Sequence, residues 1–568
     1  MVGSLAGFLG AASERSGVEP FPPADAFALL APGLQRALWE MKWKDLRPIQ
    51  REAILAWNGV DDTGRKPVPA DLLIMAQTAG GKTEAAFLPV LSQIAAEAEG
   101  SVRALYVGPL KALINDQFER VELLCRHMDM PVHRWHGDVG ADAKSSLVAS
   151  PSGVLLITPE SLESLLINRT PRLGAMFGGL RAVVIDELHA FLESERGLHL
   201  ASLLSRLGRY VGGGVRPRRV GLSATIGDPM AAARYLCADA PETVRMIEGK
   251  GEQKELLVRV HWYGEEAGAS GLRPEHGPEA RDPACDPEDD PTVRAIGADL
   301  VTHMHASTNL VFANAKGRIE ILADAANAVC RERGLEERFH VHHGSLSRVL
   351  REDVEREMKE PSPDTAICSS TLEMGIDIGS VRTVGQVGTP WSVASLKQRL
   401  GRSGRRDGES RRLRVYLTDD SEPESENPEK RLPLDLLQAV AVMELMLTDR
   451  WVEPPSPSRL DLSTLTQQVV SGIAETGGMR AAELHERLCV AGAFRGVSAA
   501  VFARVLRSLG TRDVVEQTAS GELILGLEGE RVRASREFYA TFHTPREYAV
   551  RAGDAALGTL PMTCLLYT

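Results

Sequence analysis

The sequence has few cysteines, and they form no C-x-x-C pair. The seven are scattered through the 568 residues, at Cys125, Cys237, Cys285, Cys330, Cys368, Cys489 and Cys564. Because zinc sites and disulfide frameworks need clustered or regularly spaced cysteines, the pattern argues against both. Scattered single cysteines suit a reducing cytoplasm, and we expect a cytoplasmic localisation.

Long hydrophobic runs are also absent. A membrane-spanning helix needs about 20 apolar residues, and the nearest candidate, 432–447, is interrupted by Asp435 and Glu444. We interpret this segment as an amphipathic helix. The N-terminal residues do not have the pattern of a signal peptide. We therefore expect no association with a membrane.

The chain has no excess of positive charge. Its 65 Lys and Arg residues are outnumbered by 77 Asp and Glu residues, and the net charge is −12. A global basic field that attracts nucleic acid is thus excluded, and any such binding needs a local groove. The length and the hydrophobic content of 43% fit about three or four globular domains.

The sequence does contain a candidate phosphate-binding loop, AQTAGGKT, at 76–83. An apolar run at 71–75 precedes it, and a helix-compatible run at 84–94 follows. Strand, tight loop and helix aim backbone N–H groups and the positive end of the helix at one point, where a polyphosphate fits. Lys82 can then reach the phosphates of ATP, and Thr83 can ligate Mg²⁺. The other predicted nucleotide-binding residues of the loop are Gln77, Thr78, Ala79, Gly80 and Gly81, and Ala76 replaces the first glycine of the usual motif.

Five further short β-rich runs, all before residue 223, end in polar motifs. The runs and motifs are 102–107 with GPLK, 132–135 with HGD, 154–157 with TPESL, 182–185 with DELH, and 220–222 with SAT. Mostly apolar strands that alternate with helices predict a parallel sheet covered on both faces. Such sheets bind ligands at the carboxyl ends of their strands. We therefore expect all these motifs at one edge.

A second alternating unit spans 310–417, without a phosphate loop of its own. From about residue 460 the pattern changes to three helical segments and a hairpin, which predicts a winged helix. The predicted organisation is a weakly ordered N-terminus at 1–25, a first α/β domain at 26–262, an acidic linker at 263–292, a second α/β domain at 293–425, a winged-helix domain at 430–530, and the start of a truncated β-rich domain at 531–568.

The two carboxylates of the DELH motif, which follows the predicted strand 182–185, are candidate catalytic residues. In a phosphate-loop ATPase the first, Asp186, holds Mg²⁺, and the second, Glu187, orients and deprotonates the attacking water. Upstream of the loop, Gln50 has an amide that can pair with an adenine edge. His189 either couples the carboxylates to Ser223 or Thr225, or has only a structural role.

The strongest motif of the second half is QRLGRSGR at 398–405. Arg402 and Arg405 are three residues apart, so one helical face is predicted to present both guanidiniums. A planar guanidinium matches a γ-phosphate and stabilises the charge that develops as this group leaves. The motif opens with Gln398, and these two arginines would complete a site that closes only when the two sheets meet; hydrolysis would then drive motion.

Loop tips at the predicted sheet edges carry backbone N–H groups, small hydroxyls and one lysine. These groups suit sugar–phosphate contacts and carry no base readout. We therefore predict binding to single strands with little sequence preference, although an ordinary loop cap explains each single residue equally well. The predicted contact residues are Pro109, Lys111, Thr158, Glu160, Ser345 and Thr371.

In their order, these motifs resemble those of superfamily 2 helicases of the DEAD/DEAH-box type. The resemblance covers residues 27–420 and is carried by LRPIQ, AQTAGGKT, GPLKAL, TPESL, DELH, SAT, HHGS, TLEMGID and QRLGRSGR. Within the superfamily, the run ELHAFLESERGLHL at 187–200 and a winged helix directly after the second sheet are similar to the Lhr (large helicase-related) group.

The resemblance implies two RecA-like domains in tandem, followed by a winged-helix domain. It implies ATP-dependent 3′-to-5′ translocation on single-stranded DNA and unwinding of DNA or RNA–DNA duplexes, in DNA repair or defence. It also implies that Gly375 and Asp377 contact the nucleotide. Protein partners in a repair or defence complex are a further expectation.

Two other functions stay open at this point. An ATP-switched clamp would remodel a nucleic acid–protein complex without processive unwinding. A DNA-binding regulator built on the winged helix would carry an inactive ATPase, but Lys82, Glu187 and Arg405 argue against it. The residues themselves do not distinguish DNA from RNA.

Overall fold

The structure is a computed structural model of the chain. It describes residues 25–60, 70–77, 80–95, 100–192, 194–214, 216–224, 226–249, 254–263, 290–360, 362–373, 378–404, 408–418, 427–454, 461–540, 547–552 and 555–561. The predicted weakly ordered N-terminus and most of the predicted acidic linker lie outside the described residues.

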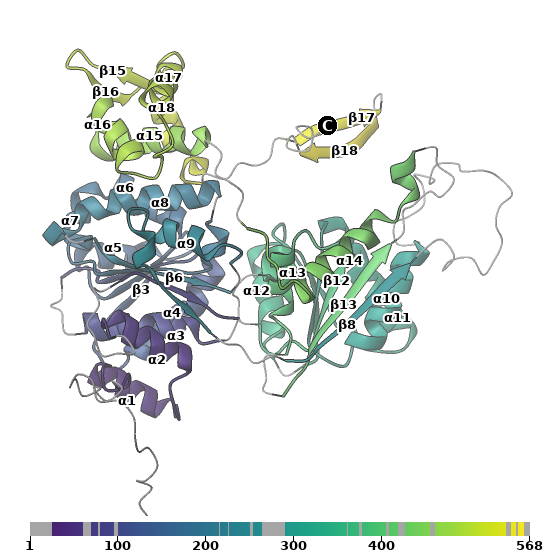
Figure 1. Cartoon of the computed structure of the whole chain (residues 1–568). Coiled ribbons are helices and arrows are strands. Elements are labelled where there is room, and N and C mark those ends of the chain that lie inside the picture. Colours follow the sequence, from purple (N-terminus) through teal and green to yellow (C-terminus); the bar gives the residue numbers. More distant parts are fainter. Residues whose placement is uncertain are drawn as a thin grey trace, which may run out of the picture.

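Two parallel sheets form the centres of two lobes, and a smaller unit of helices lies against the first lobe (Figure 1). The first lobe holds a seven-stranded sheet in the order β3-β4-β2-β5-β6-β1-β7, in which every pair of neighbours is parallel. Its strands are β1 (Leu72–Met75), β2 (Ala104–Val107), β3 (Val132–Trp135), β4 (Val154–Ile157), β5 (Ala182–Ile185), β6 (Arg218–Ser223) and β7 (Arg245–Glu248).

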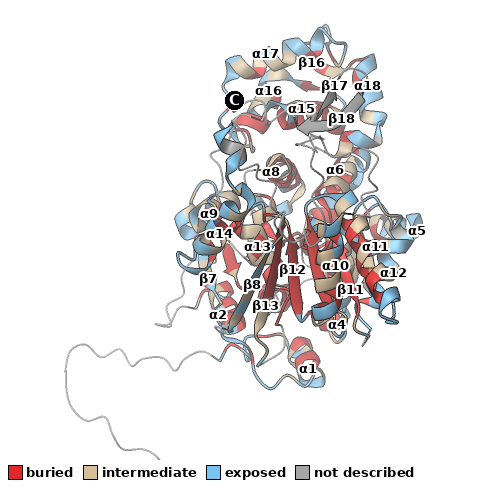
Figure 2. Cartoon of the chain, turned by 90° about the vertical axis from the view of Figure 1, so that its right-hand side faces the viewer, coloured by how far each residue is buried: buried red, intermediate tan, exposed pale blue. Residues whose placement is uncertain are grey.

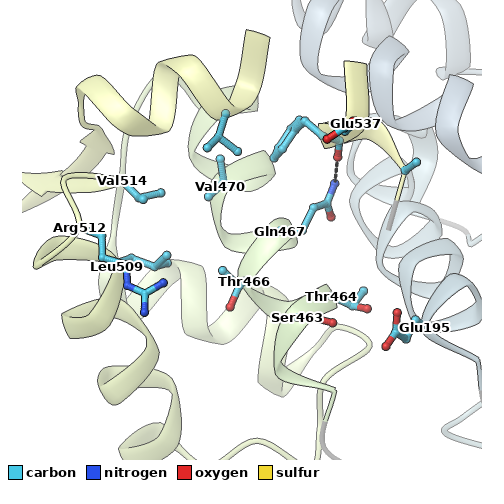
Figure 3. A pocket seen from close by; sticks show the side chains of 13 residues that line it. Glu195, Ser463, Thr464, Thr466, Gln467, Val470, Leu509, Arg512, Val514 and Glu537 are labelled. Atoms are coloured by element: carbon cyan, nitrogen blue, oxygen red, sulfur yellow. Dashed lines mark hydrogen bonds between the residues drawn. The ribbon is translucent and has the colours of Figure 1, made fainter. Parts of the chain in front are cut away.

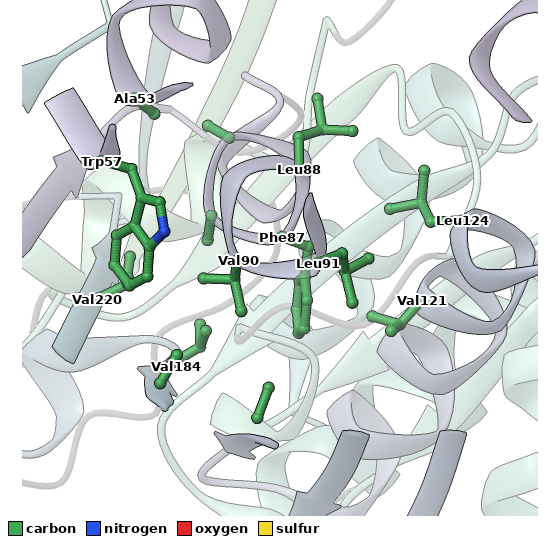
Figure 4. Close-up of a cluster of buried hydrophobic side chains, with 14 of the residues drawn as sticks. Ala53, Trp57, Phe87, Leu88, Val90, Leu91, Val121, Leu124, Val184 and Val220 are labelled. Atoms are coloured by element: carbon green, nitrogen blue, oxygen red, sulfur yellow. The ribbon is translucent and has the colours of Figure 1, made fainter. Parts of the chain in front are cut away.

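Helices cover both faces of this sheet because the central strands are apolar on both sides. One face packs against α1 (Pro32–Glu40), α2 (Pro48–Trp57), α3 (Lys82–Ile94) and α4 (Lys111–Cys125). The other packs against α5 (Ala141–Ala149), α6 (Pro159–Asn168), α7 (Thr170–Phe177), α8 (Glu195–Leu207) and α9 (Pro229–Leu236). Figure 4 shows the first cluster, where Phe87, Val90 and Leu91 of α3 lie in the core with Val121 and Leu124 of α4.

The second lobe holds a six-stranded sheet in the order β10-β11-β9-β12-β13-β8, again with parallel neighbours. Its strands are β8 (Leu256–Tyr263), β9 (Asn309–Ala313), β10 (Phe339–His342), β11 (Thr365–Cys368), β12 (Thr383–Val387) and β13 (Arg411–Thr418). The helices α10 (Pro291–Met304) and α11 (Lys316–Glu332) pack on one face. The helices α12 (Arg348–Glu357), α13 (Val393–Leu400) and α14 (Leu434–Leu447) pack on the other, and the strands between them are largely buried (Figure 2).

Two predicted domain boundaries are wrong. The segment before residue 262 was assigned to the first domain, but β8 pairs with β13 along its whole length and is an edge strand of the second sheet. Likewise α14 was assigned to the winged-helix domain, but its residues Ala439, Val442 and Met446 pack in the core of the second lobe. Both errors have one cause. Each element packs on partners that are distant in the sequence, so no local sequence pattern reveals the contact.

The third unit contains four described α-helices and a small antiparallel sheet in the order β14-β16-β15. Its elements are α15 (Leu462–Thr476), β14 (Met479–Arg480), α16 (Ala481–His485, which continues as a π-helical turn to Val490), α17 (Ala499–Gly510), β15 (Val515–Gln517), β16 (Glu522–Leu525) and α18 (Leu527–Ala534). The predicted three helices and hairpin are present, and their assignment as a winged helix stays a prediction. The final described strands, β17 (Glu547–Ala552) and β18 (Ala555–Pro561), form an antiparallel pair.

A buried polar network fastens the third unit to the first lobe. Glu163 of α6, whose side chain is fully buried, accepts hydrogen bonds from Arg206 Nη1 at 2.7 Å and Gln468 Nε2 at 2.6 Å. Arg206 of α8 also donates through Nε to Glu475 at 2.6 Å. Burial alone would raise the pKa of Glu163, but Arg206 and His199 lower it well below its ordinary value of 4.5. The junction is therefore an ionic contact inside a core, whose partners stabilise one another.

Beside this network, a cavity of about 390 Å³ lies between α8 and the third unit (Figure 3). Glu195 of α8 lines it together with residues of the third unit, among them Ser463 and Thr464 of α15. Gln467 donates to the Phe538 carbonyl at 3.1 Å across it.

None of the helices in the described part of the chain is long and apolar enough to cross a membrane.

The Glu163→Gln substitution should destabilise the protein at neutral pH by about 3 kcal/mol, because it leaves Arg206 short of a buried counter-charge. The folded-state pKa of Glu163 is depressed, so its stabilisation is present above pH 4.5 and is lost as the pH falls. The difference from the wild type should shrink by about 1.4 kcal/mol per pH unit below 4.5. Thermal unfolding at several pH values measures it.

Glu160→Gln is the matched control on the same helix. Glu160 pairs with Arg196 at 2.8 Å, and both side chains are partly exposed, so the loss should be about 0–1 kcal/mol. Equal effects of the two substitutions would contradict a special role for the buried network.

Candidate nucleotide site between the lobes

The phosphate loop joins β1 to α3 at the carboxyl edge of the first sheet. Gly81 has φ 81°, a left-handed conformation that suits glycine. Lys82 and Thr83 follow it in the first turn of α3, and both are buried. The Lys82 ammonium has no hydrogen-bond partner among the described residues. A buried cation of this kind needs an anion, so the loop fits a phosphate group. Thr78 and Ala79 lie outside the described residues.

Gln50 of α2 lies directly against this loop. A Cβ on Gly81 would stand 2.7 Å from the Gln50 amide nitrogen, so a larger residue there would displace the Gln50 side chain. The Gln50 side-chain oxygen accepts from the Arg47 N–H at 2.9 Å and thereby caps its own helix. The structure thus brings Gln50 to the phosphate loop, while its contact with adenine stays a prediction. Gly80 is confined in the same way, since a Cβ there would lie 2.8 Å from the Gln77 carbonyl.

The carboxylate pair follows β5, one strand beyond β6 from the loop. Tyr106 donates to Asp186 Oδ2 at 2.6 Å, and the Glu187 N–H donates to Oδ1 at 2.8 Å. Burial and the neighbouring Glu187 raise the pKa of Asp186 to about 6, and Lys82 opposes this shift. A cation beside Asp186 would offset the same cost, so the pair fits Mg²⁺. Sequence reasoning missed Tyr106, which is an ordinary strand residue by its pattern.

Glu187 has a strained backbone. Its φ of 47° and ψ of 49° are left-handed, a conformation that costs a residue with a side chain about 1–2 kcal/mol. Such strain is typical of functional sites, where the surrounding structure over-determines the geometry. Here it sets the turn from β5 into the short helix η1 (Leu188–Ala190).

His189 joins the two lobes. Burial, with help from Lys82, lowers the pKa of His189 to about 4, so the ring is neutral at pH 7. Its Nε2 lies 2.6 Å from the Gln398 amide nitrogen of α13, and its Nδ1 lies 3.0 Å from the Ser223 hydroxyl. Because an amide nitrogen is only a donor, Nε2 accepts, and Nδ1 carries the proton towards Ser223. The contact with Ser223 that the sequence left open is therefore present.

A second bond between the lobes was not predicted. Arg411, at the start of β13, donates to the side-chain oxygen of Gln77 in the phosphate loop. Arg411 is one of several arginines on β13 and has no motif around it. Both bonds between the lobes therefore involve residues in or next to the proposed nucleotide-binding elements.

The predicted helical face with two guanidiniums is wrong. The helix α13 ends at Leu400, and Gly404 has φ 65°, so the chain turns away before it reaches β13. Arg402 is buried and donates to the Glu373 carbonyl of its own lobe at 2.9 Å. Its contact with phosphate stays a prediction. Arg405, Gly375 and Asp377 lie outside the described residues.

The predicted nucleic-acid contacts all follow the carboxyl ends of strands or begin the next helix, but most have local partners. Pro109 and Lys111 follow β2, and Lys111 pairs with Asp138 at 3.2 Å. Thr158 caps α6 by accepting from the Ser161 N–H. Glu160 forms an ion pair with Arg196, so a nucleic-acid strand at this position would meet a salt bridge.

The two predicted contact residues of the second lobe also have local partners. Ser345 follows β10 and accepts from the Lys316 ammonium at 2.6 Å. Thr371 follows β11, with its hydroxyl 2.9 Å from His342 Nδ1. Lys316 was not among the predicted contacts, and it adds a cation to this edge.

Comparison with known proteins identifies two helicase domains in the chain. The DEAD/DEAH box helicase family matches residues 47–232, and the helicase conserved C-terminal domain matches 294–407. The chain therefore carries both domains of the DEAD/DEAH-box helicases, and the family likeness predicted from the motifs is confirmed.

Within this class, the chain is a homologue of the Lhr helicases. It is 29% identical over 370 residues to the ATP-dependent helicase Lhr-Core of Methanothermobacter thermautotrophicus. The matched region covers 61% of this chain and 40% of that protein. It is 28% identical over 489 residues to the Lhr helicase/uracil glycosylase of Escherichia coli, which covers 78% of this chain and 30% of that protein. The chain thus spans less than half the length of these relatives.

Solved structures give the same result for the fold. The Mycobacterium smegmatis helicase Lhr bound to ssDNA and AMP-PNP has a TM-score of 0.71 at 25% identity, over 90% of this chain and 62% of that one. The DUF1998 helicase MrfA bound to DNA has a TM-score of 0.64 at 22% identity, over 91% of this chain and 61% of that one. Two RecA-like domains in tandem are confirmed.

Lys82→Ala should weaken ATP binding by about 10- to 150-fold, because it removes one charged hydrogen bond worth about 1.5–3 kcal/mol. Isothermal titration with a non-hydrolysable ATP analogue measures the affinity. Lys359→Ala, an exposed lysine beyond α12, should leave it unchanged. Unchanged affinity in Lys82→Ala would remove this residue from the site.

Proposed function

We propose that this chain is a nucleic-acid-stimulated ATPase that translocates 3′-to-5′ along single-stranded DNA and unwinds DNA or RNA–DNA duplexes. The observation that carries the proposal is the convergence of Lys82, the Asp186–Glu187 pair and Gln398 of the other lobe around His189. A phosphate loop, two carboxylates and a group from a second lobe are the parts that couple ATP hydrolysis to motion.

Each residue has a role in this proposal. Lys82 binds the β- and γ-phosphates of ATP, and Glu187 takes the proton of the attacking water. Thr83 and Asp186 are the residues that would hold Mg²⁺, which when bound neutralises charge on the phosphates. Gln398, Arg402 and Arg405 act from the second lobe.

Coupling to motion follows from the two interlobe bonds. The His189–Gln398 bond starts two residues from the proposed base, and the Gln77–Arg411 bond starts inside the phosphate loop. A nucleotide that moves either element changes the contact between the lobes. Closure and opening of the cleft then follow the state of the nucleotide.

Single-stranded DNA is proposed as the track because the carboxyl edges of both sheets carry hydroxyl and lysine groups, and because the mycobacterial relative is described as bound to ssDNA. We propose in addition that the third unit is a winged helix, that the enzyme acts in the cytoplasm in DNA repair or defence, and that it has protein partners there.

Glu187→Gln should reduce nucleic-acid-stimulated ATP turnover by about 100- to 10,000-fold, because it removes the general base. ATP binding should survive, since the amide keeps the shape of the carboxylate. A coupled ATPase assay and a binding titration on the same preparation measure the two effects. Normal turnover would refute the assignment of the base.

Arg405→Ala should stop turnover and leave strand affinity nearly intact. Steady-state ATPase and fluorescence anisotropy with an oligo(dT) strand separate these effects. A fall in strand affinity with normal turnover would move Arg405 from the nucleotide site to the nucleic-acid groove.

Duplexes with a 3′ tail should be unwound in the presence of ATP, and duplexes with a 5′ tail should not. Gel-based strand displacement with both tails, for DNA and RNA–DNA duplexes, measures this. ATP hydrolysis without displacement of either duplex would favour the ATP-switched clamp over the translocase.

A further inference from the structure

Trp391 is an exposed tryptophan at the carboxyl edge of the second sheet. It lies between β12 and α13, and 73% of its surface is exposed. Single exposed apolar side chains are common on protein surfaces, so what distinguishes Trp391 is its place at this edge of the sheet. The proposed ATPase site makes no use of it, because Gln398 contacts the first lobe from the far end of the same helix.

The loop that carries Trp391 is braced on the side of β12. The carbonyl of Thr389 accepts from the Asn314 amide at 2.8 Å, and the Thr389 hydroxyl donates to the Asp435 carbonyl of α14 at 3.1 Å. Gly388 makes the preceding turn with φ 76°. Two different elements therefore hold the residue two positions before the tryptophan.

The loop is also braced on the side of α13. Ser392 caps the helix by accepting from the Ser395 N–H at 3.0 Å. The Glu453 carboxylate accepts from the N–H groups of Val393 and Ala394 at 2.6 and 3.0 Å. The backbone at Trp391 is thus fixed before any ligand arrives, which lowers the entropy cost of binding on the ring.

The position of Trp391 matches the proposed path of a single strand. Ser345, Thr371 and Lys316 follow β10, β11 and β9, and Trp391 follows β12 on the same edge. Neighbouring strands are about 4.8 Å apart, so the carboxyl ends of β11 and β12 lie about 10 Å apart along the edge. The hydroxyls and the lysine suit phosphates, whereas an uncharged ring suits the flat face of a base.

We propose that Trp391 stacks on a base of the nucleic-acid strand that crosses the second lobe. The ligand is the π-face of any base, so the contact adds affinity without sequence preference and without sensitivity to salt. This proposal rests on the proposed strand binding and adds a site to it.

The test compares two ligands, an oligo(dT) strand and an abasic sugar–phosphate strand of the same length. Fluorescence anisotropy is measured with the full chain and no nucleotide. Trp391→Ala should weaken oligo(dT) binding by about 5- to 150-fold, the range for one stacked base, and should leave abasic binding unchanged. Trp391→Phe should retain most of the affinity. The slope of affinity against salt should be the same in all variants, because no phosphate contact is removed.

Trp39→Ala is the matched control. Trp39 is 76% exposed on α1 of the first lobe, away from the sheet edge, and its loss should change neither affinity. If Trp391→Ala weakens the binding of both ligands equally, the tryptophan has a structural role. If oligo(dT) binding is unchanged, the tryptophan has no role in binding. Either result overturns the proposal and leaves the proposed strand binding intact. Wild-type protein that binds neither ligand overturns the strand-binding function first and this inference with it.

Discussion

The hydrogen bond between the neutral His189 ring and the Gln398 amide is the contact on which the arrangement of the site depends. With the amide nitrogen facing the ring, Nε2 must be unprotonated, because two donors would otherwise meet. Burial and the nearby Lys82 supply this condition by lowering the pKa of His189 to about 4. The same ring bonds Ser223 of β6, so one side chain links the strand beside the phosphate loop, the carboxylate motif and the second lobe.

The two junctions of the first lobe differ in kind, and this difference decides what can move. Towards the third unit, Glu163, Arg206 and Glu475 form buried ionic contacts that are costly to break. Towards the second lobe, the described hydrogen bonds between side chains are the amide–imidazole pair of Gln398 and His189 and the pair of Arg411 and Gln77. From these contacts we expect the first lobe and the third unit to stay together when the second lobe separates from them.

Much of the fold was predictable because its signals are local. Most of the parallel strands are short β-rich runs, and a polar motif follows each of them within a few residues, so the strand, its carboxyl end and the next helix can be recognised together. The errors fall where a partner is distant: β8 pairs with β13 across the second lobe, and α14 packs on that lobe although it precedes the third unit. The spacing of Arg402 and Arg405 was read as helical, but the turn at Gly404 ends that regularity.

The sequence by itself determined the class of fold, the phosphate loop, the carboxylate pair and the likeness to a helicase family, because these depend on residues close together in the chain. Only the tertiary structure decided that Tyr106 holds Asp186, that Arg411 reaches the phosphate loop, and that Arg402 is buried against Glu373. These contacts join residues that are 29 to 334 positions apart. Such contacts leave no periodic pattern, since they form only when the strands have taken their order in the sheet and the lobes have met.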